Sequence, residues 1–401
     1  MKTDLSVEFC GVKLENPFIL APSPFSEELG RVGKALEAGW AGVVLRTTAV
    51  ESEQVSRVYP IVTRVEDESG HLIGLENLDL ISEQHIEEME ERIKILKKRY
   101  PSKGVAASIM ANKKEDWQFL ARRFEQAGAD WLECSYSCPH GTEWYLNTNE
   151  KGPVNVEEIV RWVTEAVNDL PVVLKISAQA QDVSNIAQAT KRVGASGVCA
   201  INTLKGIPGV DLKTLIPKPN IGGLSTFGGL SGPAIKPIAL RSTAEIARRV
   251  NIDISASGGI TTWQDGVEFL LLGAKSLQVC TAVLRFGPNI IHGILAGLKN
   301  WMTENNFQTI SDFHGQSLNY LVDHTHLPRG IQMVAHIDTE GCDLCQQCYT
   351  VCSSSGFGGI EVVNKIPRVN TDCCKGCGLC MAKCPSGAIV MRRYPGFIAR
   401  Q

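Results

Sequence analysis

Residues 38–48 read Ala-Gly-Trp-Ala-Gly-Val-Val-Leu-Arg-Thr-Thr, and this eleven-residue pattern returns three times in the chain. The further copies are Ala127–Ser137 (AGADWLECSYS), Val193–Thr203 (VGASGVCAINT) and Leu272–Ala282 (LGAKSLQVCTA). The second residue of each copy is a glycine, which can take the left-handed conformation that ends a helix. A short apolar run follows, as in parallel strands covered on both faces. The pattern therefore predicts a repeated helix–strand unit.

Four further apolar runs alternate with these copies: Phe18–Ala21, Val105–Met110, Val172–Ser177 and Ile254–Ser257. Helical patterns separate the runs, among them Glu83–Lys98, Lys114–Gln126, Val156–Val167, Ser184–Val193, Thr262–Leu272 and Pro288–Met302. Eight strands, each followed by a helix or a loop, over about 270 residues are typical of a (β/α)8 barrel. An open doubly wound sheet is the alternative, but no Gly-x-Gly-x-x-Gly motif follows the first strand. We therefore expect an α/β fold, a TIM barrel over residues 1–303, whose N-terminal mouth is closed by Leu5–Phe9 and Val12–Leu14.

Cysteines gather near the C-terminus, where nine of the 14 lie within residues 342–384. The spacing Cys-x-x-Cys-x-x-Cys-x-x-x-Cys occurs twice, and a proline follows the second copy. In such runs three thiolates hold one iron–sulfur cluster and the fourth serves the other cluster. The spacing predicts one [4Fe–4S] cluster on Cys342, Cys345, Cys348 and Cys384, and a second on Cys374, Cys377, Cys380 and Cys352.

Two other interpretations of these cysteines are weaker. A Cys-x-x-Cys pair can hold structural zinc, but a doubled four-cysteine run is more specific for clusters. A disulfide framework is a property of small secreted domains. We expect a small α+β ferredoxin-like domain with two [4Fe–4S] clusters at residues 337–401, joined to the barrel by a linker at residues 304–336.

The composition argues against several functions. A net charge of −3 and a sequence pI of about 6.3 give no sign of affinity for nucleic acid or for a membrane surface. The first residues, Met1–Asp4, lack the apolar run of a signal peptide, and no stretch approaches the roughly 18 apolar residues of a membrane span. Free thiolates in this number call for a reducing compartment, so we expect a cytoplasmic protein.

Polar residues follow the strands at the end where barrels of this type carry their active sites. The candidates are Ser23, Arg46, Thr47, Asn112, Ser135, Lys175, Asn202, Thr203, Ser257, Gly258, Gly259, Cys280 and Thr281. A lone serine or threonine at such a place is usually a satisfied strand-end residue. A ring of them can hold a polar, planar ligand that bears a phosphate.

The phosphate end is the most specific part of this ring. Ser257–Gly259 and Cys280-Thr281 follow the last two strands, where barrels commonly bind phosphate, and Ser231-Gly232 add a second donor-rich turn. Lys175 is costly to bury without an anionic partner, and a reduced flavin ring would supply one. FMN is the simplest cofactor, because it joins two-electron substrate chemistry to the one-electron chemistry of clusters. We assign to it the phosphate-end residues with Ser23, Arg46, Thr47, Lys175 and Asn202.

Short motifs along the chain carry a family likeness: Asn16–Phe18, Ala107–Met110, Ser137–Gly141, Ala200–Thr203, Gly228–Gly232, Lys236–Leu240, Gly258–Ile260 and Leu277–Cys280. On these motifs the chain resembles the dihydropyrimidine dehydrogenases, within the wider dihydroorotate dehydrogenase-like group. The resemblance implies FMN, two [4Fe–4S] clusters and reduction of a C=C bond in a small-molecule substrate. It also implies a separate FAD- and NAD(P)H-binding flavoprotein subunit as electron donor, and a homodimer or a heteromer with that subunit.

The resemblance also implies individual roles. Lys175 lies by the N1 region of the flavin, and Asn202 and Thr203 contact the substrate amide. Asn112 and Ser135 stand at or near positions where the family has asparagines that clamp the pyrimidine. The phosphate site is Ser257, Gly258, Gly259, Cys280 and Thr281.

Departures from the family pattern leave the substrate open. Arg46 replaces a lysine, and the loop after Cys138, in which the resemblance implies a proton donor that is often cysteine, has no cysteine or serine in Thr142–Pro153. One reading is that another residue of the loop donates the proton; the candidates are Glu143, Tyr145, Thr148, Glu150 and Lys151. The other is that the substrate is not a pyrimidine, and Arg46, Lys113 and Lys205 would then suit a carboxylate.

Three functions therefore compete. The first is an FMN and iron–sulfur reductase of a cyclic or conjugated C=C bond, which the retained Lys175 and Asn202-Thr203 favour. The second is an electron-transfer subunit whose barrel is a docking scaffold, which the missing cysteine favours. The third is an isomerase or aldolase that uses Lys175 for a Schiff base, which would leave the clusters without a purpose.

Overall fold

The computed structural model describes residues 3–50, 59–78, 81–135, 156–179 and 182–394. The chain forms two compact units, Met1–Tyr320 and Leu321–Gln401, and each is described by itself. Within the described residues, no helix is both long and apolar enough to cross a membrane.

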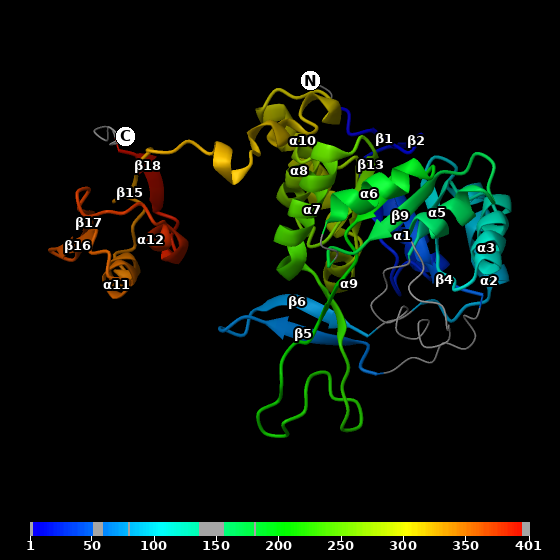
Figure 1. The fold of residues 1–401 in the computed structure, drawn as a ribbon, viewed down its shortest axis with the longest axis horizontal. Coiled ribbons are helices and arrows are strands. Elements are labelled where there is room, and N and C mark those ends of the chain that lie inside the picture. Colours follow the sequence, from blue (N-terminus) through cyan, green and yellow to red (C-terminus); the bar gives the residue numbers. More distant parts are fainter. Residues whose placement is uncertain (1–2, 51–58, 79–80, 136–155, 180–181, 395–401) are drawn as a thin grey trace. The chain divides into compact units, whose positions relative to one another are not determined.

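The first unit contains a closed barrel of eight parallel strands (Figure 1). In chain order these are β3 (Phe18–Leu20), β4 (Gly42–Thr48), β7 (Gly104–Ile109), β8 (Trp131–Cys134), β9 (Val172–Ile176), β10 (Gly197–Ala200), β13 (Asp253–Ser257) and β14 (Ser276–Val279). Because the last strand, β14, pairs in parallel with the first, β3, the sheet has no edge. The predicted barrel is therefore confirmed and an open doubly wound sheet is excluded.

Helices surround the barrel, and they lie within a few residues of the predicted positions. They are α1 (Leu29–Ala38), α2 (Ile86–Arg99), α3 (Lys114–Gln126), α5 (Val156–Thr164), α6 (Val183–Arg192), α7 (Lys236–Arg249), α8 (Trp263–Leu271), α9 (Thr281–Phe286) and α10 (Ile290–Glu304). The glycine of each eleven-residue copy has a positive φ, which is 121° at Gly39, 90° at Gly128, 96° at Gly194 and 93° at Gly273. These glycines end the helices and turn the chain into the strands, as the sequence predicts.

A hairpin closes the N-terminal mouth of the barrel. Its strands are β1 (Val7–Phe9) and β2 (Val12–Leu14), which pair antiparallel. Phe9 and Leu14 are fully buried with Trp131, the first residue of β8. The Phe9 and Trp131 rings meet edge to face, with centroids 5.9 Å apart. This apolar plug leaves the opposite, C-terminal mouth as the open end.

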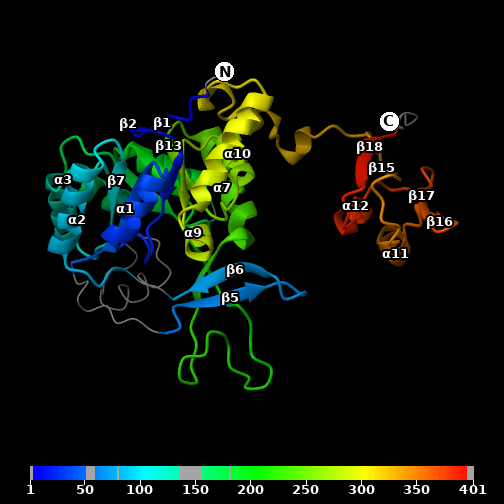
Figure 2. The ribbon, with the colours of Figure 1, turned by 180° about the vertical axis from the view of Figure 1, so that it is seen from behind.

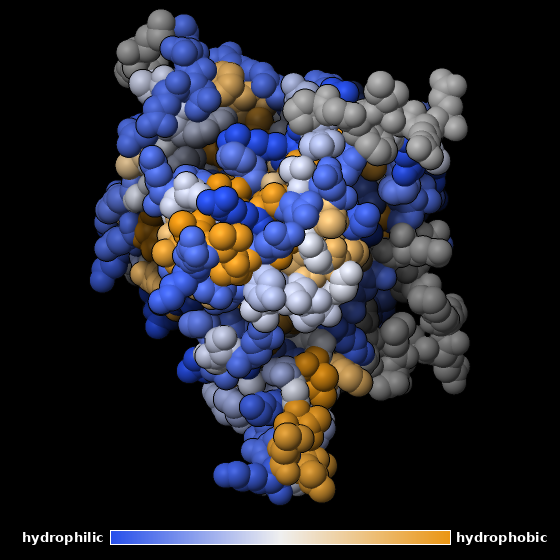
Figure 3. Space-filling view, turned by 90° about the vertical axis from the view of Figure 1, so that its left-hand side faces the viewer, coloured by the Kyte–Doolittle hydropathy of each residue, from blue (hydrophilic) through white to orange (hydrophobic). Residues whose placement is uncertain are grey.

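A four-stranded antiparallel sheet, which sequence analysis did not predict, stands at that opposite end (Figures 1 and 2). Its order is β11 (Leu204–Gly206), β12 (Gly228–Ser231), β6 (Leu72–Asn77) and β5 (Val62–Glu66). An arm of residues 207–227 projects between β11 and β12. Figure 3 shows apolar side chains at its tip, where Leu212, Leu215 and Leu224 are exposed.

The second unit is a small α+β module. It contains β15 (Met333–Ile337), α11 (Gln347–Ser354), β16 (Ile360–Val363), β17 (Ile366–Val369), α12 (Leu379–Lys383) and β18 (Ile389–Arg393). β15 pairs with β18 and β16 with β17, both antiparallel. The segment expected as a linker includes three short 3-10 helices, Ile310–Asp312, Gln316–Tyr320 and His324–His326. The predicted class of this module, α+β, is confirmed.

Candidate active site

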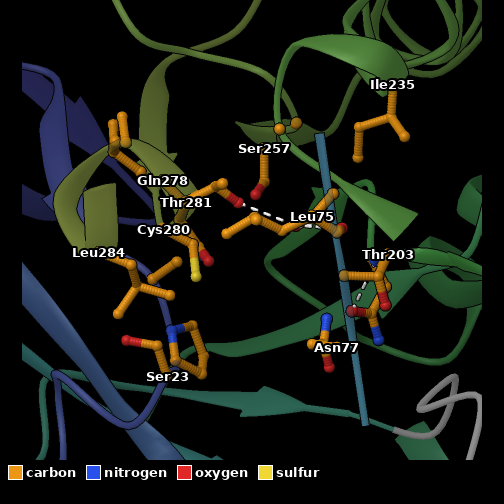
Figure 4. A pocket seen from close by; sticks show the side chains of 18 of the residues that line it. Ser23, Leu75, Asn77, Thr203, Ile235, Ser257, Gln278, Cys280, Thr281 and Leu284 are labelled. Atoms are coloured by element: carbon orange, nitrogen blue, oxygen red, sulfur yellow. Dashed lines mark hydrogen bonds between the residues drawn. The ribbon is translucent and has the colours of Figure 1, made fainter. Parts of the chain in front are cut away.

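A cavity of about 1230 Å³, including the part open to solvent, lies at the C-terminal ends of the barrel strands (Figure 4). Most of the residues predicted from the sequence line it: Ser23, Thr47, Ser135, Lys175, Asn202, Thr203, Ser231, Gly232, Ser257, Gly258, Gly259, Cys280 and Thr281. They come from several strands and from loops far apart in the sequence. The barrel thus collects the polar strand ends around one space.

The end of the cavity predicted to bind phosphate is built on two glycines. Gly258 and Gly259 have φ values of +128° and +78°, which favour glycine. A Cβ on Gly258 would lie 2.8 Å from that of Ala239, and one on Gly259 would lie 2.6 Å from that of Lys236. Only glycine therefore allows α7 to pack this closely against the turn. The close packing holds the backbone N–H groups of the turn in a fixed position beside the cavity.

Hydroxyl groups continue this wall of the cavity. The Thr281 hydroxyl donates to the Ser231 Oγ over 3.0 Å, and the Ser231 hydroxyl donates to the Leu75 carbonyl, also over 3.0 Å (Figure 4). Leu75 belongs to β6, so this chain of hydrogen bonds ties the added sheet to the start of α9. These hydrogen bonds join Thr281, Ser231 and Leu75 into one continuous wall, on the side of the cavity where the sequence predicts the cofactor to bind.

A buried ion pair forms the floor of the cavity. The Nζ of Lys175, on β9, donates to the Oε1 of Glu133, on β8, over 3.1 Å, and Glu133 is fully buried. The Nε2 of Gln278, on β14, donates to the other carboxylate oxygen over 2.5 Å. The prediction that Lys175 needs an anionic partner holds, but the partner is Glu133 of the protein itself, which sequence analysis missed.

The ion pair also determines the protonation of Lys175. Burial by itself lowers the pKa of the ammonium group, but the charge and hydrogen bond of Glu133, with the nearby Cys199 and Cys280, together outweigh burial and raise the pKa above its ordinary value. A lysine that stays protonated is not a nucleophile. The geometry therefore argues against the isomerase or aldolase interpretation with a Schiff base on Lys175.

Amide and hydroxyl groups meet on the side of the cavity next to the added sheet. Figure 4 shows Asn77, from β6, close to Thr203, which follows β10. The Asn77 amide donates to the Gly229 carbonyl over 2.9 Å, and the Thr203 N–H donates to the Asn202 Oδ1 over 2.9 Å. Sequence analysis missed Asn77 because it overlooked the hairpin. The alternating Val62–Glu66 and the Ser69-Gly70 turn are signals that could have revealed it.

Two predicted contacts are not among the described residues that line the cavity. The Arg46 guanidinium lies in a buried ion pair with Glu27, at 2.6 Å, and Ser82 donates to the other Glu27 oxygen over 2.5 Å. Asn112 is likewise absent from the lining. Their roles toward cofactor and substrate stay predictions. Because Glu27 balances the charge of Arg46, the structure gives no support to Arg46 as a carboxylate-binding residue.

The candidate proton donors Tyr145, Thr148 and Lys151, with Glu143 and Glu150, lie outside the described residues. The last described residue before this segment is Ser135, which follows β8 directly and lines the cavity.

In the second unit, cysteines from both runs come together. A small cavity is lined by Cys352, Cys374, Cys377 and Cys380, here called the Cys374 group. The Gly359 N–H donates to the Cys352 Sγ over 3.2 Å. Burial raises the pKa of the Cys380 thiol, and repulsion from Cys374 and Cys377 adds to the rise. Cysteine thiolates are the ligands of iron–sulfur clusters, and four cysteines line this one cavity.

The remaining cysteines form the Cys342 group, which consists of Cys342, Cys345, Cys348 and Cys384. Burial raises the pKa of Cys348, and repulsion from Cys342 and Cys345 adds to it. The Gln347 N–H lowers the pKa of Cys345, but Asp343 and Cys384 act in the opposite sense and the net pKa is raised. Cys384 of the second run thus stands by the first three cysteines of the first run.

Comparison with known proteins agrees with this architecture. Residues 4–302 match the dihydroorotate dehydrogenase family and residues 335–393 match the 4Fe-4S dicluster domain. The chain is 36% identical over 392 residues to the NAD-dependent dihydropyrimidine dehydrogenase subunit PreA of Escherichia coli K12, covering 96% of this chain and 95% of that relative.

More distant relatives share the barrel. Identity is 35% over 338 residues to the chloroplastic dihydropyrimidine dehydrogenase (NADP(+)) of Arabidopsis thaliana, covering 81% of this chain and 79% of the relative. It is 34% over 313 residues to the catalytic subunit of the dihydroorotate dehydrogenase B (NAD(+)) of Pyrococcus furiosus, covering 78% and 98%.

These matches confirm the resemblance predicted from the motifs, and with it an oxidoreductase acting on CH–CH bonds that carries an iron–sulfur module. The chain belongs to the dihydroorotate dehydrogenase family.

Proposed function

We propose that the barrel cavity holds FMN, that the second unit holds two [4Fe–4S] clusters, and that the protein reduces a C=C bond of a pyrimidine-like substrate. The observation that carries the proposal is the cavity, which combines a glycine turn, a buried protonated lysine and a cluster of amides at one end of the barrel. The Gln278 Oε1 on its floor is buried and has no hydrogen-bond partner among the described residues. A ring N–H of a bound flavin would supply that partner.

FMN supplies hydride transfer to carbon and one-electron exchange with clusters. The residues of the chain bind and orient it. The turn at Gly258-Gly259 would hold the phosphate, with Thr281 beside it, and Lys175 would place its charge at the ring end. Asn202, Thr203 and Asn77 line the same cavity and would offer donors and acceptors to an amide substrate.

The clusters follow the two cysteine groups. We assign one [4Fe–4S] cluster to the Cys342 group and the other to the Cys374 group, since each group combines three thiols of one run with the fourth of the other. Iron binding would require the thiols as thiolates, and the positive charge of the iron ions would offset the repulsion between these thiolates. The clusters make this chain the electron-accepting side of a larger system. We infer that an FAD- and NAD(P)H-binding flavoprotein subunit supplies the electrons and that the protein works as a homodimer or as a heteromer with that subunit.

The charge distribution favours an uncharged substrate over a carboxylate. Lys175 is the charged residue among the described residues that line the cavity, and Glu133 balances it. Arg46 is balanced by Glu27, and the Lys205 ammonium lies over the Phe227 ring, 5.2 Å from its centroid. A carboxylate entering this site would lose its hydration without meeting an unpaired cation among the described residues of the cavity. A neutral cyclic amide meets no such cost.

A proton donor must complete the reduction, and it comes from residues 136–155. The candidates in this segment are Glu143, Tyr145, Thr148, Glu150 and Lys151. A carboxylic acid, a phenol and an ammonium group can each act as a general acid, and single substitutions at these five positions distinguish the candidates.

Anaerobic titration of the reconstituted, dithionite-reduced protein tests the proposal. Uracil, thymine and orotate are added separately while the flavin absorbance is followed. We expect reoxidation by uracil or thymine and none by orotate. Reoxidation by none of them, from a flavin that dithionite reduces normally, would favour the alternative of an electron-transfer subunit with little substrate chemistry of its own.

A further inference from the structure

We propose that Glu133 is a positioning residue that sets both the charge and the hydrogen-bonding pattern of the cavity floor. It is fully buried on β8 and is not among the described residues that line the cavity. Two of its partners, Lys175 and Gln278, do line it, whereas a third, the buried Cys199, is not among the lining residues. Glu133 therefore acts on a ligand only through these two side chains. The inference rests on the proposed FMN site.

The position of Glu133 allows its side chain to connect opposite sides of the barrel. β9, which carries Lys175, is the neighbour of β8, whereas β14, which carries Gln278, stands four strands away in the closed order of eight. The hydrogen bond from Gln278 to Glu133 thus spans the barrel interior, while the ion pair with Lys175 joins adjacent strands. One carboxylate fixes two side chains that approach the cavity from opposite walls.

The carboxylate dictates which way the Gln278 amide faces. An ionised carboxylate only accepts hydrogen bonds, so the NH2 group of Gln278 must point at Glu133 and its oxygen must point elsewhere. That oxygen is buried without a partner among the described residues. It is therefore a preset acceptor for an N–H group of the ligand. A neutral residue at position 133 would allow the amide to turn over.

The carboxylate also sets the electrostatic potential at the floor. Lys175 alone would present one full positive charge to the ligand, and an opposite charge nearby favours an anionic form. Glu133 behind it cancels most of that charge. The pair should stabilise the reduced, anionic flavin less than a lone lysine would. Glu133 thus keeps the midpoint potential of the flavin low enough for it to pass electrons on to the substrate.

The first test is the two-electron midpoint potential of bound FMN in Glu133→Gln, measured by dye equilibration in the full protein. This variant keeps the size of the side chain and removes the charge. We expect a higher midpoint potential than in the unaltered protein. Combining Glu133→Gln with Lys175→Met should lower the potential again relative to Glu133→Gln alone. A potential for Glu133→Gln equal to or below that of the unaltered protein would overturn the charge-setting role.

The second test uses Gln278→Met, which leaves both charges in place and removes only the amide. We expect weaker binding of FMN to the apoprotein, measured by quenching of flavin fluorescence, with a smaller change of midpoint potential than in Glu133→Gln. Unchanged FMN affinity would refute the acceptor role of Gln278, and this test remains available if Glu133→Gln does not fold. Failure of the unaltered protein to bind FMN would instead refute the proposed function.

Discussion

Replacing Lys175 by Met measures how much the buried ion pair at the cavity floor contributes to the free energy of unfolding. Glu133 is fully buried and Lys175 is 7% exposed, so the substitution leaves a carboxylate in the barrel interior whose remaining partners include the Gln278 amide and the Cys199 thiol. Removing one partner of a buried ion pair costs about 3–5 kcal/mol. Because the Gln278 hydrogen bond survives, we expect the lower end, about 3 kcal/mol. For a unit of this size, Met1–Tyr320, that corresponds to a midpoint of thermal unfolding lower by about 4–5 °C.

The matched control is Lys175→Met combined with Glu133→Gln. It lacks the same lysine, so any loss of flavin contacts is common to both variants, but it leaves no unpaired charge. Replacing both partners of a buried pair is often nearly neutral, so the double variant should unfold close to the unaltered protein. Tryptophan fluorescence is the appropriate probe, because all seven tryptophans lie between Trp40 and Trp301 and report the first unit alone.

The pH dependence gives an independent check. In the unaltered protein the folded pKa of Lys175 is raised, so the stabilisation is complete below the unfolded pKa of about 10.4 and is lost only as pH rises through the folded value. Lys175→Met has no such group, so its deficit relative to the unaltered protein should be the same at pH 5.5 and at pH 8. A deficit that changes between these two pH values, or equal unfolding temperatures of the single and double variants, would refute the reasoning.

Two further substitutions test the clusters and the substrate wall. Cys352→Ala should damage the cluster of the Cys374 group, seen as loss of its electron paramagnetic resonance signal, whereas the exposed Cys373→Ala should leave both signals intact; loss of the other cluster would contradict the pairing. Gly229→Ala would bring a Cβ to 2.5 Å from the Thr203 Oγ1, and the displaced hydroxyl should lower kcat/KM by about tenfold, or about 1.4 kcal/mol. Gly206→Ala, whose nearest atom would be 3.7 Å away, should leave kcat/KM unchanged.

The barrel was predictable because its signal is local and repeated. Each glycine of the eleven-residue copies has the positive φ that the pattern requires, and the apolar run after it forms a barrel strand. The cysteine spacing is equally local, and Cys352 of the first run does lie at one cavity with Cys374, Cys377 and Cys380 of the second. The four-stranded sheet is different, because β6 and β12 come from segments about 150 residues apart. No periodicity within either segment encodes that pairing.

The ion pair at the cavity floor could not be predicted from the sequence, for a related reason. Glu133 stands within the apolar run of a strand, where it interrupts the pattern, and its partners lie on two other strands. The sequence does show that Lys175 is costly to bury alone. It cannot show that the compensating charge lies on the adjacent strand, because only the register of β8 and β9 brings the two side chains together. Sequence analysis therefore wrongly assigned to the flavin the negative charge that compensates Lys175.

That correction changes how the site should bind ligands. If Lys175 had no carboxylate partner, the cavity floor would attract any anion, including phosphates and carboxylates that are not substrates of a flavin enzyme. With Glu133 in place, the cavity has a neutral floor, backbone donors at the glycine turn and amides on the side of the added sheet. If FMN binds as proposed, anions would be drawn to the glycine turn, and the space beside the amides would be left to a neutral substrate. The same ion pair that stabilises the barrel would then separate the proposed cofactor subsite from the proposed substrate subsite.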